Sequence, residues 1–385
     1  MKVCYISYVQ YGGGSWVHTK QFIDALKEIH HDVVVHTPLA GVDYNEEKQE
    51  GWWATSSLVH HIRELRFLLA MFVRHAAGEI KLLRSIKPDV VILRQGRYLS
   101  ASLLCRVMKI PVILEVNGPA LENKFSPKDQ QMRCHWFWPW LERKMLAVPD
   151  HIMVVSETLK QYYTAYGIPE EKITSVPNGV DIQTFTPGVN GERIREKFGL
   201  TGKTIVGFSG NFAPWRGLHL LAEVMQRIAA MDKYPDVRLL LVGTSGELMT
   251  MPELPEAITV ITGHIPHDEM PEYLAAIDIF VAPYPPIDPF YFSPLKIFEA
   301  MAMGKPVIAS AQGQICELIA DQESGLLYPP GDEEALLQSI ERLLAEHEVR
   351  DELGKNARKT MESTFTWSDN AKRMLALCHK VCDIS

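Results

Sequence analysis

The sequence lacks the features that would place it across a membrane, in an oxidising compartment or on nucleic acid. No apolar run in its 385 residues reaches the roughly 20 residues that a membrane-spanning helix needs. Its six cysteines are scattered and form no C-x-x-C pair, so we expect reduced, buried thiols in a cytosolic protein. Met1-Lys2 leads directly into a strand-like run, so no signal peptide is expected. The net charge of −8 argues against a dedicated nucleic-acid binder.

Several motifs for cofactor and metal chemistry are also missing. There is no G-x-G-x-x-G fingerprint for a nicotinamide cofactor and no P-loop. The segment GFSGN (207–211) lacks the last glycine of a G-x-S-x-G nucleophile turn. His264 and His267 have the side chains of metal ligands, but nothing nearby in the sequence completes a site. We therefore expect neither a cofactor nor a bound metal.

What is present is an alternation of strand-like and helical patterns, with 46% hydrophobic and 22% charged residues, as in ordinary α/β proteins. Such alternation indicates βαβ units with parallel sheets. The length exceeds the size at which one core usually keeps growing, so two domains are expected. In the first half we predict strands over 3–9, 32–37, 89–94, 111–116 and 151–156, and helices near 16–29, 58–86, 98–109 and 130–146.

A break rich in Pro, Gly and Asn (176–191) separates this half from a second series of the same kind. The two halves predict two Rossmann-like, doubly wound domains facing across a cleft, with ligands expected in that cleft at the carboxyl ends of both sheets. In the second half the predicted strands are 204–210, 237–243, 257–263, 279–284 and 306–310, and the predicted helices lie near 217–231, 268–276, 294–303, 314–320, 332–346 and 349–362.

The stretch FSPLKIFEAMAMGKPVIAS (292–310) predicts a helix that starts with a misplaced charge. Ser293 suits the N-cap and Pro294 the first helical position. Lys296 then stands where a capping box would have a carboxylate, at the positive end of the helix dipole. Glu299 lies one turn further on the same face, where it could accept hydrogen bonds from ribose hydroxyls or pair with Lys296.

Arg216 breaks the same rule in NFAPWRG (211–217), at the helix start that follows the first strand of the second half. Two such cations, each after a strand, indicate a shared anionic ligand such as a diphosphate. The alternative is two solvated side chains. A third signal is the run Gly12, Gly13 and Gly14 after the first strand, which either lets main-chain amides approach an anion or sugar or forms a flexible turn.

Together these segments, with VPNGVDIQTFTP (176–187) and ESGLLYPPGDEEAL (323–336), resemble the retaining GT-B glycosyltransferases of the family 4, group 1 kind, in a branch with an E-V-N-x-P motif. The resemblance covers essentially the whole chain. It implies an acceptor domain over 1–186, a nucleotide-sugar domain over 187–363 and a C-terminal helix over 364–385 that crosses back onto the first domain. It also implies an enzyme of the hexosyltransferase type that uses no metal and acts in polysaccharide biosynthesis.

The resemblance carries roles to individual residues. Arg216 and Lys296 would bind the donor diphosphate and stabilise it as it leaves, and Glu299 would hold the ribose. The leaving phosphate would take the proton of the acceptor hydroxyl. The remaining donor contacts would be main-chain amides of Phe292, Ser293, Pro294 and Leu295, the base-flanking Gly263, His264 and Ile265, and Gly13 and Gly14 at the phosphate and reacting centre.

Two positions depart from the family pattern. Tyr291 stands where the first glutamate of a Glu-x7-Glu pair usually meets the donor sugar. Asn117, flanked by Glu115 and Glu122, stands where a histidine often lies near the reacting carbon, so Asn117 is the residue expected to assist transfer. These departures leave two alternatives open: a GT-B sugar-nucleotide epimerase, or a nucleotide-sugar-binding assembly partner without chemistry.

The class of acceptor can be inferred only from features in the first half of the sequence. Residues 60–87 hold six Lys/Arg against two Glu along an apolar helical pattern, and aromatic residues gather at Trp52-Trp53 and in CHWFWPWLERK (134–144). This combination suits peripheral contact with an anionic membrane and a lipid-linked acceptor on its cytoplasmic face. The alternative is a long core helix with a solvated basic face.

Overall fold

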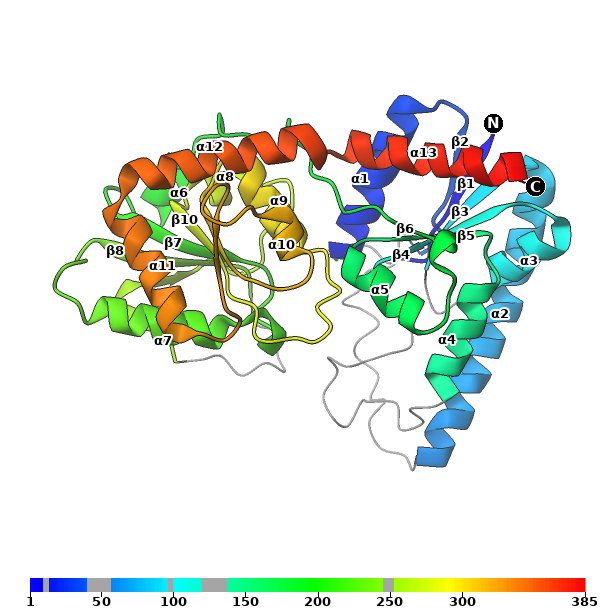
Figure 1. Ribbon diagram of the computed structural model, residues 1–385, viewed down its shortest axis with the longest axis horizontal. Coiled ribbons are helices and arrows are strands. Elements are labelled where there is room, and N and C mark those ends of the chain that lie inside the picture. Colours follow the sequence, from blue (N-terminus) through cyan, green and yellow to red (C-terminus); the bar gives the residue numbers. More distant parts are fainter. Residues whose placement is uncertain (10–13, 40–56, 96–99, 120–136, 245–252, 385) are drawn as a thin grey trace. The chain divides into compact units, whose positions relative to one another are not determined.

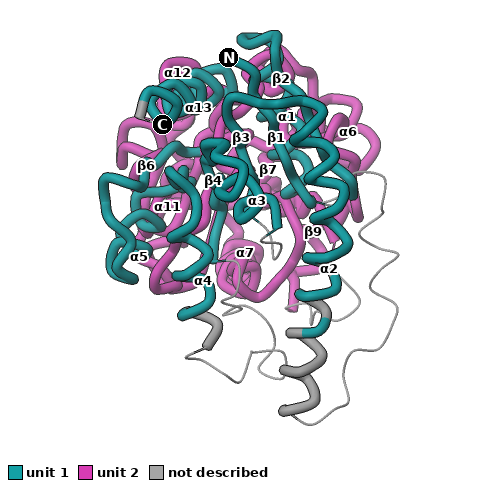
Figure 2. The backbone as a smooth tube through the Cα atoms, turned by 90° about the vertical axis from the view of Figure 1, so that its right-hand side faces the viewer, with its two compact units in different colours: residues 1–177, 367–385 teal, residues 178–366 magenta. Residues whose placement is uncertain are grey.

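The computed structural model describes residues 1–9, 14–39, 57–95, 100–119, 137–244 and 253–384. The chain forms two compact units, coloured separately in Figure 2. Unit 1 comprises Met1–Pro177 and Trp367–Ser385, and unit 2 comprises Asn178–Thr366. The chain therefore leaves unit 1 at 177 and returns to it at 367, whereas the sequence predicted boundaries at 186 and 363.

Unit 1 is built on a six-stranded parallel sheet in the order β2-β1-β3-β4-β5-β6. Strands β1, β3, β4 and β5 are buried throughout, as expected for a parallel sheet with helices on its faces. The strands are β1 (Val3–Ile6), β2 (Val33–His36), β3 (Val90–Arg94), β4 (Val112–Val116), β5 (His151–Val154) and β6 (Ile173–Ser175).

The helices of unit 1 include the last helix of the chain, which lies against the first (Figure 1). Trp367 Nε1 donates a hydrogen bond to Gln21 Oε1 at 2.6 Å, and this contact ties the two helices together. The helices are α1 (Gly14–Ile29), α2 (Ser57–Ile86), α3 (Ser100–Met108), α4 (Phe137–Ala147), α5 (Glu157–Ala165), the 3-10 turn η3 (Glu170–Lys172) and α13 (Trp367–Ile384).

Unit 2 repeats the architecture with a second six-stranded parallel sheet, in the order β12-β11-β10-β7-β8-β9. Its strands are β7 (Thr204–Ser209), β8 (Val237–Val242), β9 (Thr259–Ile261), β10 (Ile279–Ala282), β11 (Val307–Ser310) and β12 (Leu326–Tyr328). Its helical elements are α6 (Glu192–Lys197), η4 (Pro214–Arg216), α7 (Leu218–Ala229), η5 (Glu256–Ile258), α8 (Met270–Ala275), α9 (Leu295–Ala302), α10 (Ile315–Leu318), α11 (Glu333–Ala345) and α12 (His347–Thr364).

Two apolar clusters cover the two faces of this sheet. Leu240 and Val242 of β8 join the cluster that contains α9 and α12, while their neighbours Leu239 and Leu241 join the cluster that contains α7 and α11. Successive strand residues point to opposite faces, so both faces of the sheet must be apolar. The doubly wound α/β fold predicted for each half is confirmed.

Every predicted strand is present, usually a few residues shorter than its apolar run. The elements without a prediction are β6 and β12, which have three residues each, the short helices α5 and α6, and the 3-10 turns η3, η4 and η5. Three cysteines are buried free thiols as expected: Cys4, Cys105 and Cys378. The expectation of burial is wrong for Cys316, which is exposed on α10, and Cys382 is partly exposed. Within the described part of the chain, no helix is both long and apolar enough to span a bilayer.

Candidate functional site

The strand order of unit 2 places a topological switch point between β7 and β10. The chain runs from β7 outward through β8 and β9, then returns to the other side of β7 as β10. Open parallel sheets bind ligands outside the carboxyl ends of the strands at such a point. Arg216 lies in η4 directly after β7, and Lys296 lies on α9 directly after β10, so the fold brings both predicted cations to this edge.

The amine of Lys296 reaches back to the end of β7. Its Nζ donates to the main-chain oxygen of Ser209 at 2.5 Å and lies 4.7 Å from the centre of the Phe208 ring. Gly210, with φ of +122°, makes this approach feasible because a Cβ there would lie 2.2 Å from the amine. Desolvation, and then the charge of Arg216, hold the pKa of Lys296 well below its usual 10.5, although Glu299 partly opposes them.

Arg216 is held by neutral partners. Its Nη1 donates to Tyr284 Oη at 3.0 Å, its Nε donates to Asn211 Oδ1 at 3.3 Å, and the guanidinium carbon lies 5.7 Å from the Tyr284 ring centre. Among the ion pairs of the described residues, neither Arg216 nor Lys296 is paired with a carboxylate. Two cations that repel one another and have neutral partners form a site suited to an anion.

The turn that carries Arg216 requires a glycine next to it. Gly217 has φ of +75°, and a Cβ on it would lie 1.5 Å from the main-chain oxygen of Pro283, which follows β10. The backbone after β7 and the backbone after β10 are therefore in direct contact at Gly217. This contact fixes where Arg216 projects from the sheet edge.

Gly217→Ala should lower the free energy of unfolding by well over the roughly 1–2 kcal/mol that a left-handed backbone alone costs. The added methyl group collides with a backbone oxygen, which cannot move independently. Urea unfolding of Gly217→Ala and Gly202→Ala provides the comparison, because Gly202 has φ of +73° and nothing within 4 Å of its Cβ position. Equal losses in the two variants would show that the contact with Pro283 is unimportant.

Glu299 has a partner that the sequence did not predict. His267 Nε2 lies 3.0 Å from Glu299 Oε1, and the two side chains are 33% and 12% exposed. The His267 ring packs 5.5 Å from the ring of Phe185. His267 is thus placed to orient the Glu299 carboxylate. In the described part of the chain, no group of three His, Cys, Asp or Glu side chains could hold a metal ion.

The predicted start of α9 is wrong by one residue. Pro294 occupies the N-cap and Leu295 begins the helix, so Ser293 does not cap it. The reason is that Ser293 is engaged by Asn178: its Oγ accepts from Asn178 N at 3.4 Å and its main-chain oxygen accepts from Asn178 Nδ2 at 3.0 Å. The PNGVD segment therefore positions the FSPLK loop. Pro294 has no N–H and cannot supply a main-chain amide.

Tyr291, which stands at the position of the family's first glutamate, belongs to an aromatic cluster. It is 4% exposed, with its ring centre 4.9 Å from that of Phe292, which in turn lies 5.3 Å from Phe290. Phe292 packs against the apolar core of unit 2. The rings at 291 and 292 therefore help to hold the loop that precedes α9.

The other predicted donor residues are placed as follows. Gly263 has φ of +78° and pairs with Gly243 across an isolated bridge, His264 is exposed, and Ile265 packs partly against the core. Gly14 begins α1 in unit 1 and is exposed. Gly12, Gly13 and Glu122 lie outside the described residues.

In unit 1 the corresponding sheet edge holds a fully buried carboxylate, Glu115 of β4. Four side chains converge on it from two strands, a helix and the loop after β4, and Asn117, the residue predicted to assist transfer, is one of them. They are Tyr5 Oη at 2.7 Å, His18 Nε2 at 2.5 Å, Arg94 Nη1 at 2.5 Å and Asn117 Nδ2 at 3.2 Å. We call this group the Glu115 cluster. The sequence singled out only Glu115 and Asn117 of its members.

Two family models match adjacent parts of the chain and together cover most of it. The model described as Glycosyltransferase Family 4 matches residues 12–184, and the model described as Glycosyl transferases group 1 matches residues 203–346. The chain belongs to the family 4, group 1 glycosyltransferases.

Relatives of this glycosyltransferase align over part of their length. YtcC of Bacillus subtilis is 28% identical over 245 residues, which is 58% of each chain. A GDP-mannose-dependent alpha-mannosyltransferase of Mycobacterium tuberculosis is 28% identical over 280 residues, covering 70% of this chain and 68% of the relative.

Solved structures share the fold of the glycosyltransferase from end to end. Sucrose-phosphate synthase of Thermosynechococcus elongatus matches with a TM-score of 0.74 at 21% identity, covering 100% of both chains. Anabaena HepE in complex with UDP-glucose matches with a TM-score of 0.72 at 17% identity, covering 99% of this chain and 100% of HepE. The two six-stranded sheets are those of a GT-B glycosyltransferase.

Proposed function

We propose that this glycosyltransferase moves a sugar from a nucleotide-diphosphate-sugar donor to a hydroxyl acceptor with retention of configuration at the anomeric carbon. The observation that carries the proposal is the pair Arg216 and Lys296 at the switch point of unit 2, held by neutral partners. A diphosphate matches two adjacent cations in charge and size. The mannosyltransferase relative is named as GDP-mannose-dependent, and HepE was solved with UDP-glucose, which supports a nucleotide-sugar donor.

In this mechanism the two cations act on the leaving group. As the bond from the anomeric carbon to the diphosphate oxygen breaks, negative charge builds on that oxygen, and Arg216 and Lys296 stabilise it where it develops. The acceptor oxygen bonds to the same face of the anomeric carbon, and its proton passes to the leaving phosphate. Because two side-chain cations balance the charge, the reaction needs no metal. Glu299, oriented by His267, accepts hydrogen bonds from the ribose.

Hydrolysis fits the site less well than transfer. A glycosidase brackets the bond with two carboxyl groups roughly 5 to 9.5 Å apart. The position where the family pattern would supply a second glutamate holds the buried Tyr291. Within the donor loop that runs from 290 to 299, Glu299 is the one carboxylate, and it is engaged by His267.

Unit 1 would supply the acceptor side, with Asn117 assisting transfer. The acceptor is proposed to be a glycan or a lipid-linked saccharide of a cell-surface polysaccharide, presented on the cytoplasmic face of the membrane. Helix α2 supports peripheral contact there, since Leu69 and Val73 are each 65% exposed. These two apolar residues lie among exposed cations of the same helix: Arg66, Arg74, Lys81 and Arg84.

A thermal-shift screen against UDP-, GDP- and ADP-sugars tests the donor class. At a hundredfold excess over Kd, a true donor should stabilise the protein by about 2.7 kcal/mol. The Glu299→Gln variant should retain a smaller shift, because its amide oxygen is a weaker acceptor for ribose hydroxyls. No shift with any of the three donors at millimolar concentration would reject the proposal.

Turnover separates transfer from the two alternatives. Incubation with donor alone would yield an epimeric sugar nucleotide if the protein were an epimerase. Donor binding in calorimetry without turnover against a broad acceptor panel would identify a nucleotide-sugar-binding partner, which the buried Tyr291 favours. A glycosylated product whose anomeric configuration matches that of the donor in NMR spectra supports the proposed reaction.

A further inference from the structure

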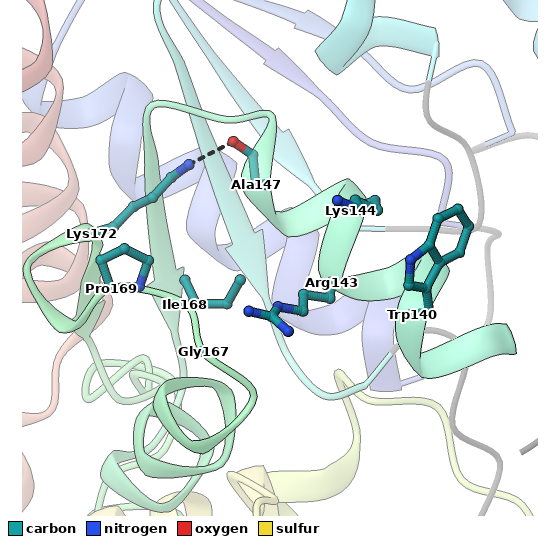
Figure 3. Close-up of a pocket in the computed structure, with 8 residues that line it drawn as sticks. All are labelled: Trp140, Arg143, Lys144, Ala147, Gly167, Ile168, Pro169 and Lys172. Atoms are coloured by element: carbon teal, nitrogen blue, oxygen red, sulfur yellow. Dashed lines mark hydrogen bonds between the residues drawn. The ribbon is translucent and has the colours of Figure 1, made fainter. Parts of the chain in front are cut away.

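A second cationic site lies in unit 1, away from the strand ends that carry the Glu115 cluster. A pocket of about 490 Å³ opens between α4 and the segment that joins α5 to β6 (Figure 3). Ala147 ends α4 shortly before β5, and Lys172 directly precedes β6, so the pocket lies at the amino ends of these strands. The Glu115 cluster lies toward their carboxyl ends. The pocket is therefore a separate site within unit 1.

One face of α4 forms one side of this pocket. Trp140, Arg143, Lys144 and Ala147 recur at positions i, i+3, i+4 and i+7 and so lie on one side of the helix. Gly167, Ile168, Pro169 and Lys172 form the opposite side (Figure 3). Three cations and an indole thus line the pocket together with uncharged residues, and Trp140 is 51% exposed.

Two of the cations are fixed by the backbone around them. Figure 3 shows the Arg143 guanidinium extending from α4 toward Gly167, where a Cβ would lie 2.6 Å from Nη2. Gly167 has φ of +83°, a conformation that favours glycine, and because it has no side chain it leaves room for the guanidinium. Lys172 Nζ donates to the main-chain oxygen of Ala147 at 2.8 Å, at the carboxyl end of α4.

The charges around the pocket leave it positive. Among the ion pairs of the described residues, none includes Arg143, Lys144 or Lys172. Two acids precede Lys172 in the chain: Glu171 is adjacent to it, and Glu170 is bound to Lys160 at 3.0 Å. Near Lys172, the negative Asp150 and the positive Arg106 oppose one another. A protein of net charge −8 thus concentrates three cations around one hollow.

We infer that this pocket binds a phosphate ester joined to an apolar group, with Arg143 and Lys144 contacting the phosphate and Trp140 the apolar part. The guanidinium of Arg143 suits a phosphate group because its N–H donors form a fixed fork, and the amine of Lys144 adds a second positive charge. An exposed indole beside them suits a hydrocarbon chain or a ring at an interface. An anionic phospholipid and a soluble phosphate ester share this chemistry. The inference does not depend on glycosyl transfer, because the pocket lies outside the proposed active site.

Two measurements test the site and distinguish a membrane lipid from a soluble phosphate ester as its ligand. They are co-sedimentation with phosphatidylglycerol vesicles, and calorimetry with water-soluble dihexanoyl phosphatidylglycerol or inorganic phosphate. The double variant Arg143→Ala/Lys144→Ala should lower the affinity for vesicles by roughly thirtyfold, because each of the two cations lost contributes about 1 kcal/mol at an anionic surface. Lys20→Ala/Lys27→Ala is the matched control, since it removes two exposed cations from α1 of the same unit. Binding to vesicles alone assigns a membrane lipid, and binding of the soluble probes assigns a free phosphate ester.

Gly167→Ala provides a test that leaves the net charge unchanged. Its methyl group should displace the Arg143 guanidinium and weaken binding at least severalfold, whereas Gly202→Ala, with a similar φ and nothing near its Cβ, should not. Circular dichroism confirms that each variant is folded. If Gly167→Ala does not fold, Lys172→Gln takes its place: it removes one positive charge but keeps a hydrogen-bond donor near Ala147, and it should also weaken binding. Equal losses in the pocket and α1 variants, or no binding of any probe, would overturn the inference.

Discussion

Replacing Lys296 with alanine should slow sugar transfer by about 10²–10³-fold, the usual cost of removing one group that stabilises developing charge. The direct contacts of the amine described above are with neutral groups, since it donates to the main-chain oxygen of Ser209 and lies near the Phe208 ring. Unit 2 should therefore stay folded. Arg216→Ala should produce a loss of the same order, because Arg216 lies at the same sheet edge.

Lys305→Ala is the matched control for this experiment. Lys305 also has a desolvated amine that donates to a main-chain oxygen, that of Ala275 at 2.8 Å, and burial lowers its pKa to about 8. It follows the carboxyl end of α9, whereas Lys296 lies near the amino end. Steady-state rates with a saturating donor should fall in Lys296→Ala and persist in Lys305→Ala. Unchanged donor binding and rate in both Lys296→Ala and Arg216→Ala would remove the diphosphate assignment.

The pH dependence of donor binding adds an independent measurement of the same prediction. Desolvation and the charge of Arg216 lower the pKa of Lys296 in the free protein, while a diphosphate binds its charged form. Above that lowered pKa, binding must take up a proton, so donor affinity should fall as pH rises through it. Lys296→Arg keeps its charge throughout this range, and its affinity should not show that fall. Calorimetry in buffers of different ionisation enthalpy measures the proton uptake directly.

Replacing Glu115 with alanine should lower the stability of unit 1 by about 3–5 kcal/mol, the cost of removing one partner of a buried ion pair. Arg94 is only 5% exposed and would be left without its carboxylate, and Tyr5, His18 and Asn117 would lose their common acceptor. Hydrogen exchange of the β3 and β4 amides reports on unit 1 separately from unit 2. Glu170→Ala, which breaks the exposed pair with Lys160, should cost about 1 kcal/mol or less.

Acid should weaken unit 1 through the same cluster. Burial alone would raise the pKa of Glu115, but the charges of Arg94 and His18, with hydrogen bonds from His18 and Tyr5, hold it well below its usual 4.5. A carboxyl group with a lowered pKa stabilises the fold above its unfolded pKa, and this contribution is lost as pH falls. Stability should therefore decline below about pH 4.5, and the decline should be smaller in Glu115→Gln. Equal acid sensitivity in both proteins would contradict the charged cluster.

Much of the fold could be predicted because its signals are local. Each predicted strand is an apolar run, and each long helix has an apolar face, so the alternation of the two indicates a parallel sheet with helices on both sides. Strands β6 and β12, with three residues each, are too short to show any period. The start of α9 was misplaced because Ser293 has the side chain of an N-cap, while Asn178, far away in sequence, engages it.

The candidate site could be predicted only where a residue contradicted its local setting. Arg216 and Lys296 stood out as cations at helix starts. The partners of the site residues gave no such signal, because they lie far away along the chain: His267 is 32 residues from Glu299, Tyr284 is 68 residues from Arg216, and Asn178 is 115 residues from Ser293. The cationic pocket beside α4 could not be predicted for the same reason. The segment 134–144 was noted for its aromatic residues, but Gly167 and Arg143 meet only in the folded chain.

By itself, the sequence determined that this glycosyltransferase has two doubly wound units and that two cations stand at the helix starts of the second. Short-range spacing was enough, because helix and strand periods, caps and dipoles act within a few residues. The tertiary structure alone decided what those cations touch and how Glu115 gathers Tyr5, His18, Arg94 and Asn117 around one buried carboxylate. The reason is strand order: β7 lies beside β10, and β1 beside β3, only after the sheets form.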